Sequence, residues 1–259
     1  MSSTEIRTIR ADEADQFLDL LCLVFGLDVG RARSVFFSEP MFDLDRKWAL
    51  FDEGEMRSIL TTTPLEFGNC RAFGIAGVAT IEKFQGRGYA QKILETVLEH
   101  GAEIGEPAAM LFAHNETVYK RAGFETTDRV VKGDILAELP VSAPDVLGFD
   151  EVKAIYTQWS EAEPNRLRRD ERRWKYWKWV LRTCEEARGG YVCVEPNLCR
   201  EAIVEQGLER WSVMPGSQWI GLESMTKKIG VPIENSRQEL FVMTIGFEER
   251  PQMFMTDQF

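Results

Sequence analysis

Apolar and polar residues follow one another in the first half of the chain in a pattern that predicts helices and strands in turn. Apolar residues recur at the spacing of one helix face in Ala11–Phe25 and again in Tyr89–His100. Short apolar runs bounded by turn residues predict strands at Trp48–Phe51, Met56–Phe67, Arg71–Ile81, Ala108–Ala113 and Val130–Ala137. The connections between the first three runs are too short for crossovers, so the early sheet is predicted to be antiparallel.

From residue 71 to residue 113 the order changes to strand, glycine-containing loop, helix and strand. This order is that of a βαβ unit, whose two strands are parallel. The prediction for the first half is therefore an α/β (α+β) fold with a mixed central sheet.

The second half begins after a proline-rich segment, Pro140–Pro144, which we interpret as a linker. A linker at this position predicts two domains, 1–139 and 140–259, of which the second is a smaller α+β domain. The pattern there predicts a helical region at Phe149–Arg182, strands at Tyr191–Val194, Glu201–Val204 and Leu240–Ile245, and a helix at Gln218–Lys228.

Composition narrows the classes of function. The 259 residues carry a formal net charge of −11, which argues against a nucleic-acid partner and favours cationic ones. Apolar residues make up 44%, and no run is long enough to span a membrane, so no membrane partner is expected. The first residues do not resemble a signal peptide, and the five cysteines are scattered, so we expect reduced thiols and a cytoplasmic location. With two histidines in the chain, no metal site is expected.

The segment that carries most chemistry is the loop Gln85-Gly86-Arg87-Gly88-Tyr89-Ala90 before a predicted helix. Two glycines allow a close approach of the backbone, and the free N–H groups of a helix N-terminus favour an anion such as a pyrophosphate. The loop has neither the Gly-Lys-Ser/Thr of a Walker motif nor the third glycine of a dinucleotide fingerprint. Taken alone, it is equally well interpreted as a tight turn.

A second cluster, Tyr119-Lys120-Arg121-Ala122-Gly123-Phe124, follows the next predicted strand. Together with Val78-Ala79-Thr80 and the loop, it resembles the GCN5-related N-acetyltransferase (GNAT) superfamily. In that superfamily a strand ending in Val-x-x leads into a Gln/Arg-x-x-Gly-x-Gly/Ala loop, and a Tyr-x-x-x-Gly-Phe pattern comes later. The resemblance covers roughly residues 5–137 and implies a GNAT fold with helices on both faces of the central sheet.

Within the superfamily, Ala76–Thr80 and Ala113–Glu116 resemble the Eis-like branch, whose members carry a degenerate second acetyltransferase-like domain. The segment Arg166–Trp174 resembles a stretch near the start of that second domain. This chain is shorter than typical members and would lack their third domain. The resemblance therefore does not fix the oligomeric state, and a homo-oligomer is one possible state.

The resemblance implies an N-acetyltransferase in which a primary amine attacks the thioester of acetyl-CoA within a ternary complex. It implies that the backbone of Val78, Ala79 and Thr80 faces the thioester and pantetheine, and that Tyr119 protonates the leaving thiolate. It assigns the pyrophosphate to the loop residues Gln85, Gly86, Arg87, Gly88, Tyr89 and Ala90. A small cationic amine or a lysine side chain is the expected acceptor. The alternatives are an inactive CoA-binding regulatory module and an acyltransferase for a longer acyl group.

Other interpretations of single residues stay open. Tyr119 could be a core tyrosine, Asn115 suits a helix N-cap better than a cofactor contact, and His114 is more often structural than a proton relay. No carboxylate lies in Arg71–Thr80, where many relatives carry a general base. The remaining candidates for a base are Glu39, Asp43, Glu66 and Glu82, each more often a surface charge.

Basic and aromatic residues are interleaved in Arg166–Trp179. Such a segment can bind nucleic acid or a membrane surface. Because the rest of the chain is acidic, we favour an amphipathic helix whose tryptophans pack on the core while its arginines pair with carboxylates. Trp159, Trp174 and Trp177 are the predicted buried positions.

Overall fold

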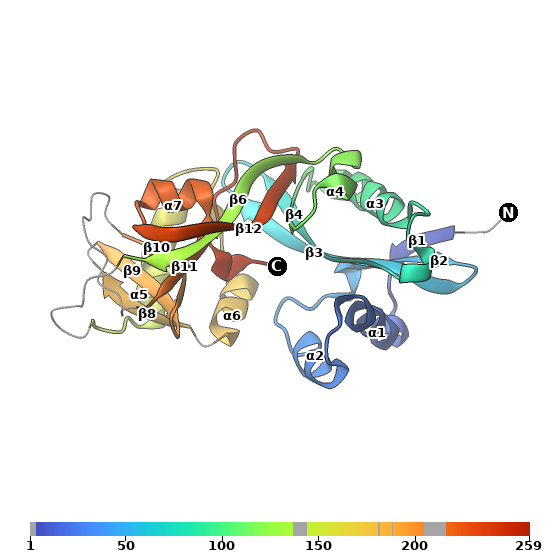
Figure 1. Cartoon of the computed structure of the whole chain (residues 1–259), viewed down its shortest axis with the longest axis horizontal. Coiled ribbons are helices and arrows are strands. Elements are labelled where there is room, and N and C mark those ends of the chain that lie inside the picture. Colours follow the sequence, from blue (N-terminus) through green and yellow to red (C-terminus); the bar gives the residue numbers. More distant parts are fainter. Residues whose placement is uncertain (1–3, 137–143, 181, 188, 205–215) are drawn as a thin grey trace.

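The computed structural model describes residues 4–136, 144–180, 182–187, 189–204 and 216–259. Its strands form one mixed sheet in the order β1-β2-β3-β4-β5-β12-β6-β11-β10-β9-β8, and β7 pairs with β3 (Figure 1). The strands are β1 (Thr4–Thr8), β2 (Lys47–Asp52), β3 (Glu55–Phe67), β4 (Arg71–Thr80), β5 (Ala108–Ala113), β6 (Glu125–Ile135), β7 (Leu167–Arg168), β8 (Thr183–Ala187), β9 (Gly190–Glu195), β10 (Leu198–Ile203), β11 (Gln218–Leu222) and β12 (Ile233–Ile245). The α-helices are α1 (Ala14–Phe25), α2 (Val29–Phe36), α3 (Tyr89–Glu103), α4 (Thr117–Arg121), α5 (Phe149–Glu161), α6 (Glu171–Trp179) and α7 (Glu223–Ile229).

The first half confirms the predicted mixed sheet with helices on both faces. Strands β1 to β4 are antiparallel neighbours, and β4 is parallel to β5, as the βαβ pattern predicts. Figure 1 shows α3 and α4 on one side of this part of the sheet and α1 and α2 on the other. Apolar residues of α3 and β4 form one buried cluster, and those of α1 with β2 and β3 form another.

Strand β12 joins the two halves of the molecule. It lies between β5 and β6 and is antiparallel to both, with Phe241 opposite Ala113 on one side and Arg129 on the other. The sheet is therefore continuous from the first half into the second. The predicted boundary between residues 139 and 140 lies outside the described residues and stays a prediction.

Two predictions for the second half are wrong in detail. The helical region predicted at Phe149–Arg182 is divided into α5 and α6 by β7, because Leu167 and Arg168 pair with Phe67 and Glu66 at the end of β3. The predicted helix at Gln218–Lys228 begins only at Glu223, since Gln218–Leu222 is strand β11, paired with β6. The ring of Trp219 lies over Gly221, where a Cβ atom would be 2.7 Å from it, so the strand buries that large ring completely.

The helix α1 is fixed at its N-terminal end by a buried carboxylate. The guanidinium of Arg7 donates to both carboxylate oxygens of Glu13 at 2.7 and 2.8 Å, and the Arg10 N–H donates to Glu13 Oε2 at 2.8 Å. The hydrogen bond from Arg7 lowers the pKa of Glu13 from 4.5 to about 2, despite the opposing effect of burial. Glu13 is therefore ionised in the folded protein down to strongly acidic pH.

We expect Glu13→Gln to be destabilising at pH 6 and progressively less so, relative to the wild type, as pH falls from 5 to 2.5. A folded-state pKa below the unfolded one stabilises the fold above the unfolded pKa of 4.5, and this contribution is lost as pH falls toward 2. Urea unfolding at a series of pH values measures the difference between the two proteins. If the difference in stability between the two proteins were independent of pH over that range, the charge of the Glu13 carboxylate would not be its source.

Among the residues that the structure describes, no helix is long and apolar enough to cross a membrane.

Candidate functional site

Strands β4 and β5 separate at one end of the sheet. Their parallel pairing runs from Ala72↔Ala108 to Ile75↔Leu111, and in the described structure no further pair follows. Just beyond, Gly77 has a positive φ of 60°, and the pairing of β4 with β3 shifts register between Ala76 and Ala79. The last residues of β4 thus remain attached to β3 while their other edge is released from β5, which leaves backbone groups for a ligand.

The glycine loop follows this released edge. Gly86 and Gly88 have φ values of 76° and 77°, a conformation that glycine adopts without strain. The Gln85 side-chain amide donates to the Thr80 carbonyl at 3.2 Å and ties the loop back to β4. Gly88 is the N-cap of α3, and no side chain caps it, so the first N–H groups of the helix are free for an anion.

A cavity of about 490 Å³ joins the released edge of β4, the loop and α4. Its wall comes from four elements: α1, the end of β4, the loop with the start of α3, and α4. The lining residues are Val24, Val78, Thr80, Phe84, Gln85, Gly86, Gly88, Tyr89, Ala90, Gln91, Val118, Tyr119 and Arg121. The two sequence clusters, some thirty residues apart in the chain, therefore meet in one cavity.

Two of the predicted cofactor-binding residues do not line this cavity. Ala79 is 2% exposed and packs in the α1 cluster, while its carbonyl accepts a hydrogen bond from Ser58 at 3.0 Å. The side chain of Arg87 is exposed and lies 4.9 Å from the ring centroid of Phe84. The other eight predicted site residues all contribute to the wall.

Tyr89 and Tyr119 both line the cavity but differ in their hydroxyl groups. The Tyr89 hydroxyl donates to Asp52 Oδ2 at 2.6 Å, which raises the pKa of Tyr89 and occupies that hydroxyl within the fold. Tyr119 makes an edge contact with Phe124 at 6.3 Å, and among the described residues its hydroxyl has no hydrogen-bond partner. Burial raises the pKa of Tyr119, so its hydroxyl keeps its proton at neutral pH and can donate it to a group in the cavity.

Some wall residues were not predicted from the sequence: Val24, Phe84, Gln91, Val118 and Arg121. Phe84 and Gln91 flank the predicted loop, and Val118 and Arg121 share the short helix of Tyr119. Their position next to the motifs in the sequence is the signal that could have identified them. Val24 comes from α1, which no local pattern connects to the loop.

The N-cap of α4 is Glu116, so the N-cap predicted at Asn115 is wrong by one position and Asn115 lies just before the cap. Its side-chain oxygen accepts from the Thr117 N–H at 2.8 Å at the start of α4. His114 is exposed and does not line the cavity.

None of the four candidate bases lines the cavity. Glu66 and Glu82 are exposed, and Asp43 is paired with Arg172 at 3.1 Å. Burial raises the pKa of Glu39, against the opposing charges of Lys47 and Arg172. No dedicated base is therefore placed beside Tyr119 by the described residues.

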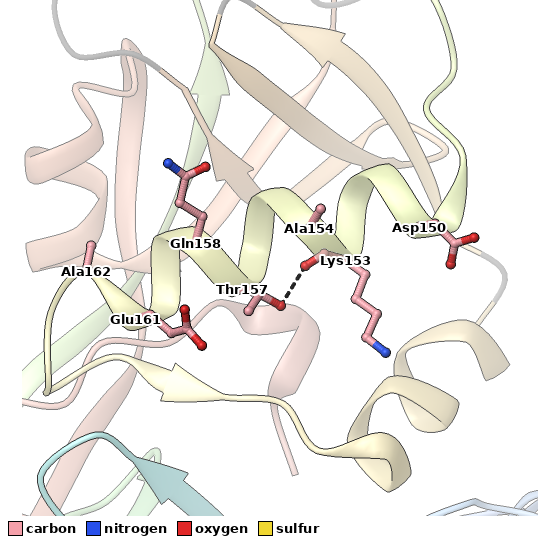
Figure 2. A pocket seen from close by; sticks show the side chains of 7 residues that line it. All are labelled: Asp150, Lys153, Ala154, Thr157, Gln158, Glu161 and Ala162. Atoms are coloured by element: carbon pink, nitrogen blue, oxygen red, sulfur yellow. Dashed lines mark hydrogen bonds between the residues drawn. The ribbon is translucent and has the colours of Figure 1, made fainter.

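A larger hollow of about 660 Å³ lies elsewhere, along the outer face of α5 (Figure 2). Every residue around it belongs to this helix or directly follows it: Asp150, Lys153, Ala154, Thr157, Gln158, Glu161 and Ala162. It is a shallow, solvent-facing helix surface, and no second element among the described residues lines it, so we do not regard it as a site.

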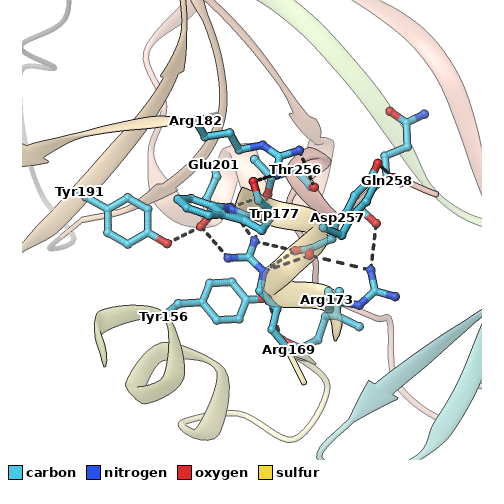
Figure 3. Close-up of polar contacts among 12 residues, drawn as sticks. Tyr156, Arg169, Arg173, Trp177, Arg182, Tyr191, Glu201, Thr256, Asp257 and Gln258 are labelled. Atoms are coloured by element: carbon cyan, nitrogen blue, oxygen red, sulfur yellow. Dashed lines mark hydrogen bonds and ion pairs between the residues drawn. The ribbon is translucent and has the colours of Figure 1, made fainter. Parts of the chain in front are cut away.

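The segment Arg166–Trp179, in which basic and aromatic residues are interleaved, has a structural role. Trp174 and Trp177 are each 4% exposed, and Trp159 packs at the edge of the same cluster. Arg169 is fully buried and donates to Glu201 Oε2 at 2.6 Å and to Asp257 Oδ2 at 2.7 Å (Figure 3). These burials and ion pairs agree with the amphipathic-helix interpretation.

The last residues of the sequence, which carried no recognisable pattern, pack beneath the sheet. Met253, Phe254 and Met255 are buried, and the ring of Phe259 occupies the space beside Gly74, where a Cβ atom would be 2.4 Å from it. The same ring lies 5.4 Å from the ring of Phe112 on β5. This segment therefore covers part of β4 and β5 close to the point where they separate.

Comparison with known proteins agrees with this architecture. Residues 5–127 match the family model described as an acetyltransferase (GNAT) domain. A search of curated proteins finds no match. The fold is similar to that of a GCN5-related N-acetyltransferase from Kribbella flavida, with 17% identity, a TM-score of 0.71, and coverage of 94% of this chain and 71% of that one.

Two other solved structures are similar over nearly the same length. A GCN5-related N-acetyltransferase from Anabaena variabilis has 15% identity and a TM-score of 0.65, with 93% of this chain and 72% of that chain covered. Eis1 from Mycobacterium abscessus has 13% identity and a TM-score of 0.62, with 92% and 73% covered. At these identities the likeness concerns the fold, in both halves of the molecule. Residues 5–127 thus match a GNAT acetyltransferase domain model, and the chain shares its fold with these larger proteins.

Proposed function

We propose that the protein transfers the acetyl group of acetyl-CoA to a primary amine by direct attack in a ternary complex. The observation that carries the proposal is the single cavity in which the released edge of β4, the glycine loop and Tyr119 meet. An edge with free backbone groups suits an extended pantetheine arm, and a helix N-terminus suits a pyrophosphate. A GNAT domain over residues 5–127 supports acyl transfer from CoA as the type of reaction.

In the proposed reaction the amine nitrogen attacks the thioester carbonyl carbon, and the carbon–sulfur bond breaks. A backbone N–H at the edge Val78–Thr80 polarises the carbonyl oxygen, which carries the developing negative charge. The acceptor ammonium first gives one proton to water, which frees its lone pair for the attack. The leaving thiolate takes the proton of the Tyr119 hydroxyl, the nitrogen gives its second proton to water as the amide forms, and Tyr119 then regains a proton from water. The acidity of the chain, −11 overall, favours a cationic acceptor such as a polyamine, an aminoglycoside or a lysine side chain.

The release of the CoA thiol, measured with acetyl-CoA and a panel of these amines, tests the reaction. We expect release that depends on the amine and saturates with it. Binding of acetyl-CoA without any amine-dependent release would overturn the proposal in favour of a CoA-binding regulatory module. Faster release from a longer acyl-CoA would change the assigned acyl group and keep the type of reaction.

Gly88→Asp tests the assignment of the pyrophosphate to the loop. Open space surrounds the position of a Cβ atom at Gly88, so the substitution adds a negative charge at the anion site without a steric clash. We expect acetyl-CoA affinity to fall by about tenfold or more, because the carboxylate repels the pyrophosphate at close range. Gly88→Asn is the matched neutral variant: it carries a similar backbone strain at the positive φ of 77° but no charge, so its loss should be clearly smaller. Equal affinity of Gly88→Asp and the wild type in titration calorimetry would refute the assignment.

A further inference from the structure

Three cationic side chains surround one aromatic ring beside the cavity. Phe84 lines the cavity wall, and its ring centroid lies 4.3 Å from Arg57 Cζ, 5.1 Å from Lys83 Nζ and 4.9 Å from Arg87 Cζ. The three charges therefore lie within about 10 Å of one another, where like charges repel appreciably. We call Arg57, Lys83, Phe84 and Arg87 the cationic cluster.

The cationic cluster is attached to the loop through the backbone. Arg57 is on β3, and its carbonyl accepts a hydrogen bond from the Ile81 N–H at 3.1 Å, directly before the turn Glu82–Phe84. Lys83 and Arg87 flank Phe84 in sequence and continue into the glycine loop. The three charges thus come from two segments that this hydrogen bond joins, next to Phe84 in the cavity wall.

These three cations have no carboxylate partner within the described structure. None of them has a carboxylate oxygen within 4.0 Å, and the buried Nε of Arg57 makes no hydrogen bond. The nearby carboxylate of Asp52 already accepts a hydrogen bond from Tyr89. Arg46, by contrast, is paired with Glu106 at 2.7 Å. In a chain of net charge −11, three neighbouring cations without a carboxylate partner among the described residues are the arrangement expected where an external anion binds.

The pyrophosphate does not account for this group. The free N–H groups at the start of α3 and the two glycines of the loop already offer it backbone donors. Arginines that lie over an aromatic ring present a planar fork of donors, which suits the oxygens of a phosphomonoester. CoA carries one such group, a 3′-phosphate on its ribose, in addition to the pyrophosphate.

We propose that the cationic cluster binds the ribose phosphate of CoA and so makes the protein select CoA over dephospho-CoA. The inference rests on the proposed function, because it places CoA in the cavity. It assigns Arg57, Lys83 and Arg87 to recognition of the phosphomonoester, and Phe84 to holding the guanidinium groups in position.

Titration calorimetry with CoA and dephospho-CoA tests the inference. We expect the wild type to bind CoA at least about tenfold more tightly than dephospho-CoA at low salt, with a preference that falls as salt rises. The triple variant R57M/K83M/R87M should reduce the preference below about threefold, because it loses much more affinity for CoA than for dephospho-CoA. Arg31→Met on α2, across the sheet, removes one exposed charge and should keep the full preference.

Each outcome bears on one proposal or both. Equal binding of the two ligands by the wild type overturns the inference and leaves the proposed function intact. An equal loss of affinity for both ligands in the triple variant also overturns it, since the cluster would then hold the pyrophosphate. Binding of neither ligand by the wild type overturns the inference together with the proposed function.

Discussion

Replacing Tyr119 by phenylalanine is expected to reduce amine-dependent thiol release by about 100-fold or more, because general acid catalysis contributes on this scale. The hydroxyl is the group lost, and among the described residues it has no partner in the fold. Acetyl-CoA affinity and thermal stability should therefore stay close to those of the wild type. The measurement is kcat from thiol release at saturating acetyl-CoA and amine.

Lys120→Gln is the control for Tyr119→Phe. It changes the next residue of α4, where Lys120 makes an exposed ion pair with Glu116 at 3.1 Å, and does not alter the cavity wall. Its activity should be near that of the wild type. Full activity in Tyr119→Phe would exclude the assignment of Tyr119 as the general acid, whereas a loss in both variants would indicate a disturbed helix.

The second large effect that we expect is a loss of stability in the variant Glu201→Gln. Arg169, Glu201 and Asp257 have fully buried side chains, and Arg173 lies 3.9 Å from Asp257, so two positive and two negative charges balance within the core (Figure 3). The hydroxyl groups of Tyr191 and Thr256 also donate to Glu201. Removing this one negative charge leaves the buried positive charge of Arg169 only partly balanced. Breaking such a buried ion pair lowers the free energy of unfolding by about 3–5 kcal/mol.

Urea unfolding measures this loss, with Glu223→Gln as the matched control. Glu223 is paired with Lys227 at 2.5 Å on the surface of α7, and loss of an exposed pair costs about 0.5 kcal/mol or less. The double variant R169M/E201L removes one charge of each sign. It should therefore cost less than the sum of its two single variants. Equal effects of Glu201→Gln and Glu223→Gln would show that the buried charges do not depend on each other.

Local features of the sequence were sufficient to predict the part of the fold around the glycine loop. The βαβ unit from β4 to β5, the glycine loop and the helix of Tyr119 are consecutive in the chain, and each has its own local signal. Such elements follow from periodicity and turn residues, because their partners are close in sequence. The meeting of the loop with Tyr119 in one cavity also follows, since a parallel pair places both connections at the same end of the sheet.

Features that depend on distant partners could not be predicted in this way. The apolar run Gln218–Leu222 fits a helix or a strand, and its pairing with β6 decides between them. The cationic cluster has no motif, because Arg57 reaches Phe84 from a strand some thirty residues earlier. Arg169 and Asp257 stand 88 positions apart, so no local pattern connects them.

The position of β12 between β5 and β6 has a consequence for the order of folding. Strand β5 is complete at residue 113 and β6 at residue 135, but the strand that joins them ends at residue 245. Until those later residues have left the ribosome, both strands present open edges, which can pair with other chains. Closing a loop of this length also slows folding. Chaperone dependence during synthesis, and aggregation of fragments that stop before β12, are therefore properties to look for in the first half of the chain.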